Sequence, residues 1–183
     1  EGSAVTSRKE DGIMEIKYFD EITDKLKAEL NHARYIHTIG VALTCAALAM
    51  KYEYDTDKAM LTGLLHDCAK CFPNEEKMRL CEEGGVELTD IEVRNPSLIH
   101  AKLGAYIAER DYNVHDPYIR DAIRTHTTGA PDMTLLQKIV FVADLIEPNR
   151  DDEIPGIDVT RKLAFEDRDR CIYRITSRQL EHL

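Results

Sequence analysis

The chain has 183 residues and a formal net charge of −10, from 24 basic and 34 acidic residues. This length fits one domain, and 43% hydrophobic with 32% charged residues is typical of a soluble globular protein. The acidic balance argues against a nucleic acid polymer as partner, because such binding depends on lysine and arginine. No apolar run approaches the roughly 20 residues that a membrane span needs, so we expect no membrane partner.

The first helices are predicted from apolar residues that recur every three or four positions. They cover residues 19–30 and 31–52, and a third helix is expected to be capped by Thr56. The inward face of the third helix is predicted to carry Met60, Leu61, Leu64 and Leu65. The apolar stripe of the second helix is expected to face the core: Ile36, Ile39, Leu43, Ala46, Ala47 and Met50.

Proline, glycine and capping residues place the later helices, because each has a preferred position at a helix end. The expected ranges are about 74–83, 96–110, 117–127, 134–147 and from 167 onward. Strand signals are nearly absent. The sequence therefore predicts an all-α fold, a single compact helical bundle.

The two ends of the chain and its cysteines bear on its origin. Residues 1–13 are small, polar and aperiodic, and we interpret them as an expression-tag remnant before a domain over 14–183. The helical pattern is unfinished at residue 183, so whether the native chain continues beyond it is left open. An odd count of five cysteines without a signal peptide predicts a cytoplasmic protein. The Cys68/Cys71 pair has metal or redox spacing but no second pair, and we interpret it as incidental.

The adjacent His66 and Asp67 end an apolar helical segment, GLLHDCAK. An acidic residue at a helix C-terminus opposes the helix dipole, and burying it requires a compensating charge such as a metal ion. The alternative is that Asp67 is exposed and caps the next turn.

A second carboxylate, Asp144, lies within the apolar segment KIVFVADLIEP. Buried carboxylates are rarely unpaired. Asp144 has no partner in its own helix, because Lys138 lies off the helical face of Asp144 and Arg150 falls beyond Pro148. A single histidine is more often a core or surface residue than a ligand. Together with the two carboxylates, however, the histidines favour a shared cation, with six candidate ligands: His37, His66, Asp67, His100, His126 and Asp144. Mixed imidazole and carboxylate ligands suit Fe, Mn, Co, Ni or Zn, and six exceed one tetrahedral zinc, which favours two ions.

The order of His37, then His66-Asp67, then Asp144 resembles the HD-domain superfamily of metal-dependent phosphohydrolases. Five segments extend the resemblance to the YqeK family of bacterial HD proteins, across essentially the whole of residues 14–183. These segments are NHARYIHTIGVA, LLHDCAK, IHAKLGAYIA, IRTHTTGAPDM and KIVFVADLIEPNRD.

The resemblance implies symmetrical hydrolysis of diadenosine tetraphosphate to two ADP by a metal-activated water. It implies one metal held by His37, His66, Asp67 and Asp144. A second would be held by His100 and His126, with Asp67 bridging. Iron is the metal that the resemblance favours, with Mn, Co, Ni or Zn as alternatives. We interpret His32 and His115 as structural or surface residues.

Substrate contacts are predicted from residues that flank these ligands. Arg34 and Lys70 lie one helical turn from His37 and His66, and either binds phosphate or belongs to a solvated face. Thr127, Thr128 and Gly129 offer hydroxyl and N–H groups to phosphate, or form an ordinary helix end. Arg150 contacts nucleotide or pairs with Asp151 or Glu147. In this mechanism Asp67 and Lys70 are catalytic, and Lys70 and Arg150 stabilise the departing ADP.

Other functions stay open at this point. HD proteins also include nucleotide monophosphatases and guanosine tetraphosphate hydrolases. A nucleotide-sensing module without catalysis is a second class, and a regulatory bundle without metal is a third, although it leaves Asp144 unexplained. We expect a dinucleoside polyphosphate or other small nucleotide as the partner, and leave a homodimer open.

Overall fold

The computed structural model describes residues 16–150 and 154–181, and within these ranges it contains helices and no strand. The expected tag remnant at 1–13 lies outside the described residues. The α-helices are α1 (Ile16–Glu29), α2 (His32–Lys51), α3 (Thr56–Leu65), α4 (Asn74–Glu83), α5 (Asp90–Arg94), α6 (Ile99–Tyr112), α7 (Pro117–Thr125), α8 (Leu135–Ile146), α9 (Ile157–Glu166) and α10 (Arg168–Glu181). Short 3₁₀ turns cover Cys68–Cys71 and Pro96–Leu98. The predicted all-α fold is confirmed, and α5 and α9 were not anticipated.

Capping side chains fix where several helices begin. The Asn31 side chain accepts a hydrogen bond from the backbone N–H three residues later at 2.9 Å, which starts α2. Asp55 makes the same bond at the start of α3, so Asp55 and not Thr56 is the cap there. Thr134 and Gln137 form a reciprocal capping box at the start of α8. These local bonds set the register in which the helices present their side chains.

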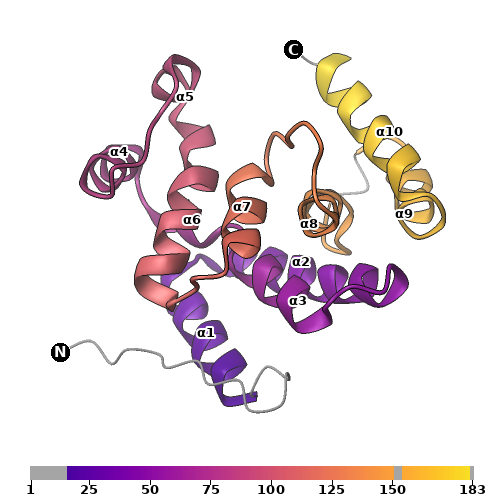
Figure 1. Cartoon of the computed structure of the whole chain (residues 1–183), viewed down its shortest axis with the longest axis horizontal. Helices are drawn as coiled ribbons and strands as arrows, with labels where there is room; N and C mark the ends of the chain where they lie inside the picture. The colour runs from indigo at the N-terminus through magenta and orange to yellow at the C-terminus, as the bar shows by residue number, and fades with distance from the viewer. Residues whose placement is uncertain (1–15, 151–153, 182–183) are drawn as a thin grey trace.

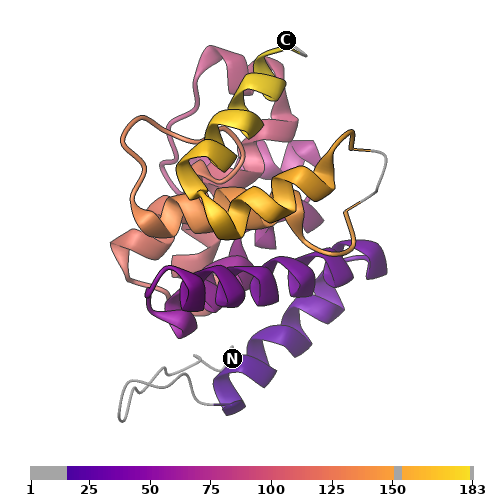
Figure 2. The same ribbon diagram turned by 90° about the vertical axis from the view of Figure 1, so that its right-hand side faces the viewer.

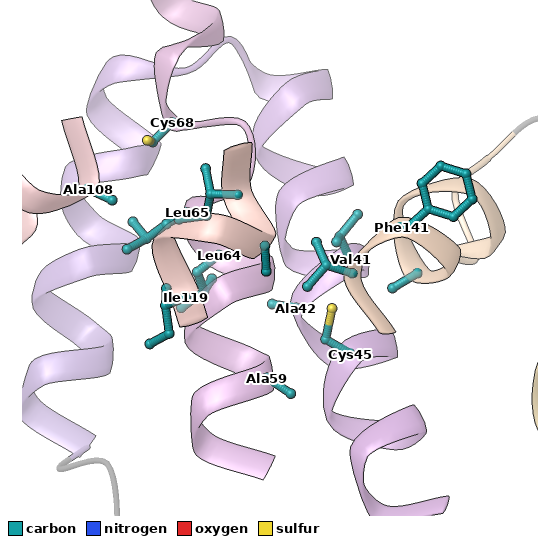
Figure 3. Packing of buried hydrophobic residues seen from close by; sticks show 14 of the residues in the cluster. Val41, Ala42, Cys45, Ala59, Leu64, Leu65, Cys68, Ala108, Ile119 and Phe141 are labelled. Atoms are coloured by element: carbon teal, nitrogen blue, oxygen red, sulfur yellow. The ribbon is translucent and has the colours of Figure 1, made fainter. Parts of the chain in front are cut away.

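The helices α2, α3, α7 and α8 pack on one another at the centre of the molecule (Figures 1 and 2). Helix α6 packs against α7 and against the 3₁₀ turn after α3. The C-terminal pair α9 and α10 packs against α8. Figure 3 shows how small side chains, including Ala42, Cys45 and Ala59, let α2 and α3 approach closely. Residues far apart in the sequence thereby come to one point between these helices.

The buried face of α2 differs from the expected one. Leu43 and Met50 are 59% and 66% exposed, and Ile36 is also exposed. The helix is apolar on most sides, so the pattern alone did not distinguish the core face. The face that packs on α3 and α8 carries smaller residues: Val41, Ala42, Cys45, Ala46, Leu48 and Ala49. On α3, Met60 and Leu61 are half-buried, whereas Leu64 and Leu65 are fully buried as expected.

Helix α2 is also long and apolar enough, by length and composition alone, to cross a membrane. Its best window has a mean hydropathy of 1.3, but 44% of that window is buried within the protein. Because α2 packs on α3 and α8 and carries His37 at its buried face, we interpret it as a core helix.

Replacing Gly63 with alanine is expected to destabilise the α2–α3 contact. A Cβ there would lie 2.8 Å from Ala42 Cα, a backbone atom that cannot move aside. Overpacking of this kind costs about 1–3 kcal/mol. Urea unfolding followed by circular dichroism measures the loss. Gly104→Ala is the matched control, because its nearest neighbour is the Ile123 methyl Cγ2 at 3.2 Å and a smaller loss is expected. Equal losses at both positions would contradict the close approach.

Candidate metal centre

The six candidate ligands converge from five parts of the chain. His37 comes from α2 and Asp144 from α8. His66 and Asp67 lie at the junction of α3 with the following 3₁₀ turn. His100 lies in the first turn of α6, and His126 caps the C-terminus of α7. All are buried except Asp144, whose side chain is 21% exposed.

The Asp67 carboxylate lies between two pairs of imidazoles. Its Oδ2 is 3.5 Å from His66 Nε2 and 3.8 Å from His37 Nε2. Its Oδ1 is 3.4 Å from His100 Nε2 and 3.5 Å from His126 Nε2. Asp144 Oδ1 joins the first pair, at 3.1 Å from His37 Nε2 and 3.8 Å from His66 Nε2. The ligand atoms therefore form two neighbouring groups that share Asp67.

Several atoms of this cluster have no hydrogen-bond partner. Among the described residues, five buried side-chain nitrogen or oxygen atoms are unpartnered, and three of them are His37 Nε2, His66 Nε2 and Asp67 Oδ1. Buried polar atoms without a partner are costly, so such a concentration calls for an explanation. The atoms lie within reach of a shared ion, and a set of imidazole and carboxylate donors suits first-row divalent metals. The residues present thus fit a divalent cation.

Three of the histidine rings are oriented by backbone carbonyls close to them in the chain. The Nδ1 atoms of His66, His100 and His126 lie 2.7, 2.6 and 2.7 Å from the backbone carbonyl oxygen three residues earlier. A carbonyl can only accept, so each Nδ1 carries the hydrogen, and in the neutral ring Nε2 is then left unprotonated toward the cluster. His37 instead directs Nδ1 at the Glu147 carboxylate. Sequence analysis did not single out Glu147 as part of the site.

The charges of the cluster support its carboxylates in the ionised form. Burial opposes ionisation of Asp67, but the imidazoles of His66 and His126 outweigh it and hold the pKa of Asp67 well below its usual value. Burial likewise opposes ionisation of Asp144, and the His37 imidazole is the main group that lowers its pKa. Burial is also the main cause that lowers the pKa of His100 to about 3, so this ring is neutral at neutral pH.

Two arginines contact the cluster carboxylates. Arg34 Nη1 lies 2.7 Å from Asp67 Oδ2. Arg150 Nη2 lies 2.6 Å from Asp144 Oδ1, and Arg150 Nε donates to the Asp144 carbonyl at 2.8 Å. Asp144 has no such partner within its own helix, as expected, but Arg150 from beyond the helix pairs with it. The chain turns back after Pro148, with Arg150 N donating to the Glu147 carbonyl at 3.0 Å, and this returns the guanidinium to α8.

The segment after α7 lies partly at the centre. Thr127 Oγ1 is 3.1 Å from His100 Nε2 and 3.2 Å from His126 Nε2. Thr128 is exposed and its hydroxyl donates to the Gly129 carbonyl. Gly129 has a positive φ of 68° and donates its N–H to the Thr125 carbonyl at 2.8 Å, as residues at helix C-termini do.

Two lysines lie near the centre. Lys70 is half-buried and close enough to His100 to lower the pKa of that ring, behind the larger effect of burial. Lys77 of α4, which sequence analysis did not single out, is buried and donates to Asn74 Oδ1 at 3.3 Å. Burial and then Lys70 lower the pKa of Lys77, so these two cations lie in one neighbourhood.

Residues interpreted as incidental lie outside the cluster. His32 is exposed at the start of α2, and the His115 side chain is 66% exposed. Cys68 and Cys71 are free thiols, and Cys71 Sγ donates to the Cys68 carbonyl. None of these four residues is part of the groups of described residues that could hold a metal.

An all-helical bundle that buries histidines and aspartates around one shared carboxylate defines a helical metal-binding protein. Residues 34–149 match the HD domain family. The chain belongs to the HD-domain family, as its sequence motifs had indicated.

The relatives agree with this assignment. The chain is 44% identical over 149 residues to the symmetrical bis(5'-nucleosyl)-tetraphosphatase of Bacillus subtilis, covering 80% of this chain and 77% of the relative. It is 37% identical over 158 residues to the protein of the same name from Staphylococcus aureus, covering 83% and 78%. A crystal structure of a predicted HD superfamily hydrolase involved in NAD metabolism, from Clostridium acetobutylicum, superimposes with a TM-score of 0.86 at 40% identity. That alignment covers 90% of this chain and 86% of the other. The resemblance inferred from the sequence segments is thereby confirmed.

Proposed function

We propose that this protein hydrolyses diadenosine tetraphosphate symmetrically to two ADP, as the names of its relatives state for those proteins. The observation that carries the proposal is the pair of ligand groups that share Asp67. One group is His37, His66, Asp67 and Asp144, and the other is Asp67, His100 and His126. We propose that they hold two divalent ions, with iron favoured and Mn, Co, Ni or Zn as alternatives.

Divalent ions held in these groups would supply Lewis-acid activation of water and charge neutralisation at the phosphoryl group. The contribution of the chain is to hold the ligands. The Asp67 carboxylate faces one imidazole pair with each oxygen, so its position fixes the spacing of the two groups. Backbone carbonyls keep the Nε2 atoms of His66, His100 and His126 free of hydrogen and directed inward. A rigid, largely buried ligand set of this kind loses little energy to reorganisation during the reaction.

The polyphosphate would be bound by the cations that surround the ligands. Arg34 and Arg150 already lie at the Asp67 and Asp144 carboxylates, so their guanidinium groups can reach phosphate oxygens next to the centre. Lys70 adds a third cation on the His100 side. We propose that Lys70 and Arg150 stabilise the departing ADP. The Thr127 hydroxyl lies at the second ligand group and can donate to a phosphate oxygen. Thr128 and Gly129 remain weaker candidates, because Gly129 N–H is used in the helix end.

The rival functions differ in what they require of the site. A nucleotide-sensing module needs binding but not a full ligand set, and here all six ligands converge, which favours catalysis. A nucleotide monophosphatase or guanosine tetraphosphate hydrolase would use the same centre and is distinguished by its products. We propose a small nucleotide as the partner and the cytoplasm as the location, while a homodimer stays untested.

The products of a complete digest of diadenosine tetraphosphate are expected to be ADP alone. Symmetrical cleavage breaks the central anhydride, and water supplies one oxygen and two protons to the two ADP molecules. Anion-exchange chromatography of the digest measures this directly. A mixture of AMP and ATP would mean asymmetric cleavage and would exclude the proposed reaction. Parallel digests of nucleoside monophosphates and guanosine tetraphosphate test the rival phosphohydrolase activities.

A further inference from the structure

Glu147 is a buried carboxylate just beyond the C-terminus of α8. It is 1% exposed, and Oε1 lies 3.1 Å from His37 Nδ1. Among the described residues, His37 is the ion-pair partner that the structure gives this carboxylate. Burying an ionised carboxylate is costly unless it is paired and hydrogen-bonded. The position of Glu147 therefore has to be accounted for by its contact with His37.

The second carboxylate oxygen is held as firmly as the first. Glu147 Oε2 accepts hydrogen bonds from Asn149 N at 2.7 Å and from Asn149 Nδ2 at 3.0 Å. Arg161 of α9 holds the surrounding turn by donating to the carbonyls of Ile146 and Glu147 at 3.0 and 3.1 Å. The side chain is thus fixed from the side opposite to His37.

Gly40 on α2 provides the space that this carboxylate occupies. A Cβ at position 40 would collide with Glu147 Oε2 and would lie 3.0 Å from Asn149 Nδ2. Gly40 is one helical turn after His37, on the same face of α2. The absence of a side chain there lets Glu147 reach the Nδ1 side of the His37 ring.

We propose that Glu147 is a positioning residue that orients His37 and raises its strength as a ligand. By accepting from Nδ1–H it leaves Nε2 unprotonated and directed at the metal centre, and its charge makes the imidazole more basic. His37 differs in this respect from His66, His100 and His126, whose Nδ1 partners are neutral carbonyls. The inference rests on the proposed metal centre, but it does not depend on which substrate is hydrolysed.

Glutamine cannot reproduce this arrangement. Both carboxylate oxygens accept hydrogen bonds, whereas an amide has one acceptor oxygen and one donor NH₂. If the amide oxygen faces Asn149, its NH₂ faces His37 Nδ1 and favours the tautomer with hydrogen on Nε2. If it is turned round, its NH₂ faces the two Asn149 donors. The first orientation reverses the His37 tautomer. The second leaves His37 with an uncharged acceptor and the Asn149 donors without one. Neither orientation changes the side-chain size.

The test is the affinity of the protein for Mn²⁺, measured by calorimetry and by competition with a chelator, in the absence of nucleotide. Glu147→Gln is expected to weaken one of the two binding events by about 10–100-fold, the usual effect of losing such a partner. The second event, assigned to His100 and His126, is expected to change little. Glu166→Gln, an exposed residue on α9, is the matched control and should bind Mn²⁺ as the parent does. Unchanged affinity in a folded Glu147→Gln protein would overturn the proposal.

A double-mutant cycle separates positioning from general structural support. If Glu147 acts through His37, Glu147→Gln should have no further effect on Mn²⁺ affinity once His37→Ala is present. Additive losses in the double variant would show that Glu147 acts elsewhere and would overturn the proposal. Should Glu147→Gln fail to fold, as judged by circular dichroism, Gly40→Ala displaces the same carboxylate in a helix that alanine favours. Weaker Mn²⁺ binding by folded Gly40→Ala supports the proposal, and parent-like binding contradicts it.

These measurements also remain independent of the proposed reaction. If the digest shows AMP and ATP while Glu147→Gln weakens Mn²⁺ binding through His37, the proposed function fails and the positioning role stands. If the digest shows ADP alone and Mn²⁺ binding is unchanged, the positioning role fails and the proposed function stands.

Discussion

Asp67→Ala is expected to lose both metal ions and to reduce turnover by at least about 10³-fold, because metal-ion stabilisation of the transition state contributes several kcal/mol. Each Asp67 oxygen faces a different imidazole pair, so one substitution removes a ligand from both groups. The loss should persist when metal is added in excess. Elemental analysis of the purified variant and steady-state rates at rising Mn²⁺ concentration measure the two effects.

His100→Ala is the control variant for Asp67→Ala, because it removes a ligand from only one of the two groups. It removes one ligand from the group with His126 and leaves His37, His66 and Asp144 in place. High metal concentration should restore part of its activity by mass action. If His100→Ala retains the metal content and rate of the parent, His100 is not a ligand. If Asp67→Ala is rescued as easily as His100→Ala, Asp67 does not bridge two sites.

Removing the metal from the unchanged protein is expected to have an effect of similar size. Dialysis against a chelator should reduce hydrolysis by at least about 10³-fold, since metal ions are proposed to activate the water and to neutralise the phosphoryl group. Returning Mn²⁺ or Fe²⁺ should restore the rate. Bound metal should also raise the unfolding temperature, because a ligand at a hundred times its Kd stabilises the folded state by about 2.7 kcal/mol.

The control for this experiment is the elemental composition of each sample. The reconstituted protein is expected to contain more than one divalent ion per chain, as two ligand groups require. A folded and fully active protein that contains no metal would show that the cluster does not perform the chemistry. Circular dichroism of the chelated sample establishes that lost activity does not reflect unfolding.

Features set by local chemistry were predictable from the sequence. Caps at Asp116 and Thr134 placed the starts of α7 and α8 within a residue, because capping requires only neighbours in the chain. The convergence of His66, Asp67 and Asp144 was expected because carboxylates at apolar positions need a compensating charge. Helix α9 was missed because it begins after Gly156 in the left-handed conformation, without a side-chain cap.

Features set by packing were not predictable. The core face of α2 could not be distinguished because the helix is apolar on most sides, and only its fit against α3 selects the small residues. Arg150 reaches Asp144 only because the chain reverses after Pro148. Glu147 did offer one signal. It follows Asp144 by three residues, so both carboxylates lie on one side of α8. Like Asp67, Glu147 is an acidic residue at a helix C-terminus, where it opposes the helix dipole and calls for a compensating charge.

The contacts of Arg161 determine how far the chain can be truncated from its C-terminal end. The match to the HD domain family ends at residue 149, yet Arg161 lies beyond it, on α9, and its guanidinium donates to the carbonyls of Ile146, Glu147 and Arg150. These are the last carbonyls of the helix that carries Asp144 and of the turn that follows it. A fragment ending at residue 149 would leave the Ile146 and Glu147 carbonyls without this donor. The helix that carries Asp144 is therefore supported by a residue beyond the segment that matches the HD domain family, and shortened versions should retain α9.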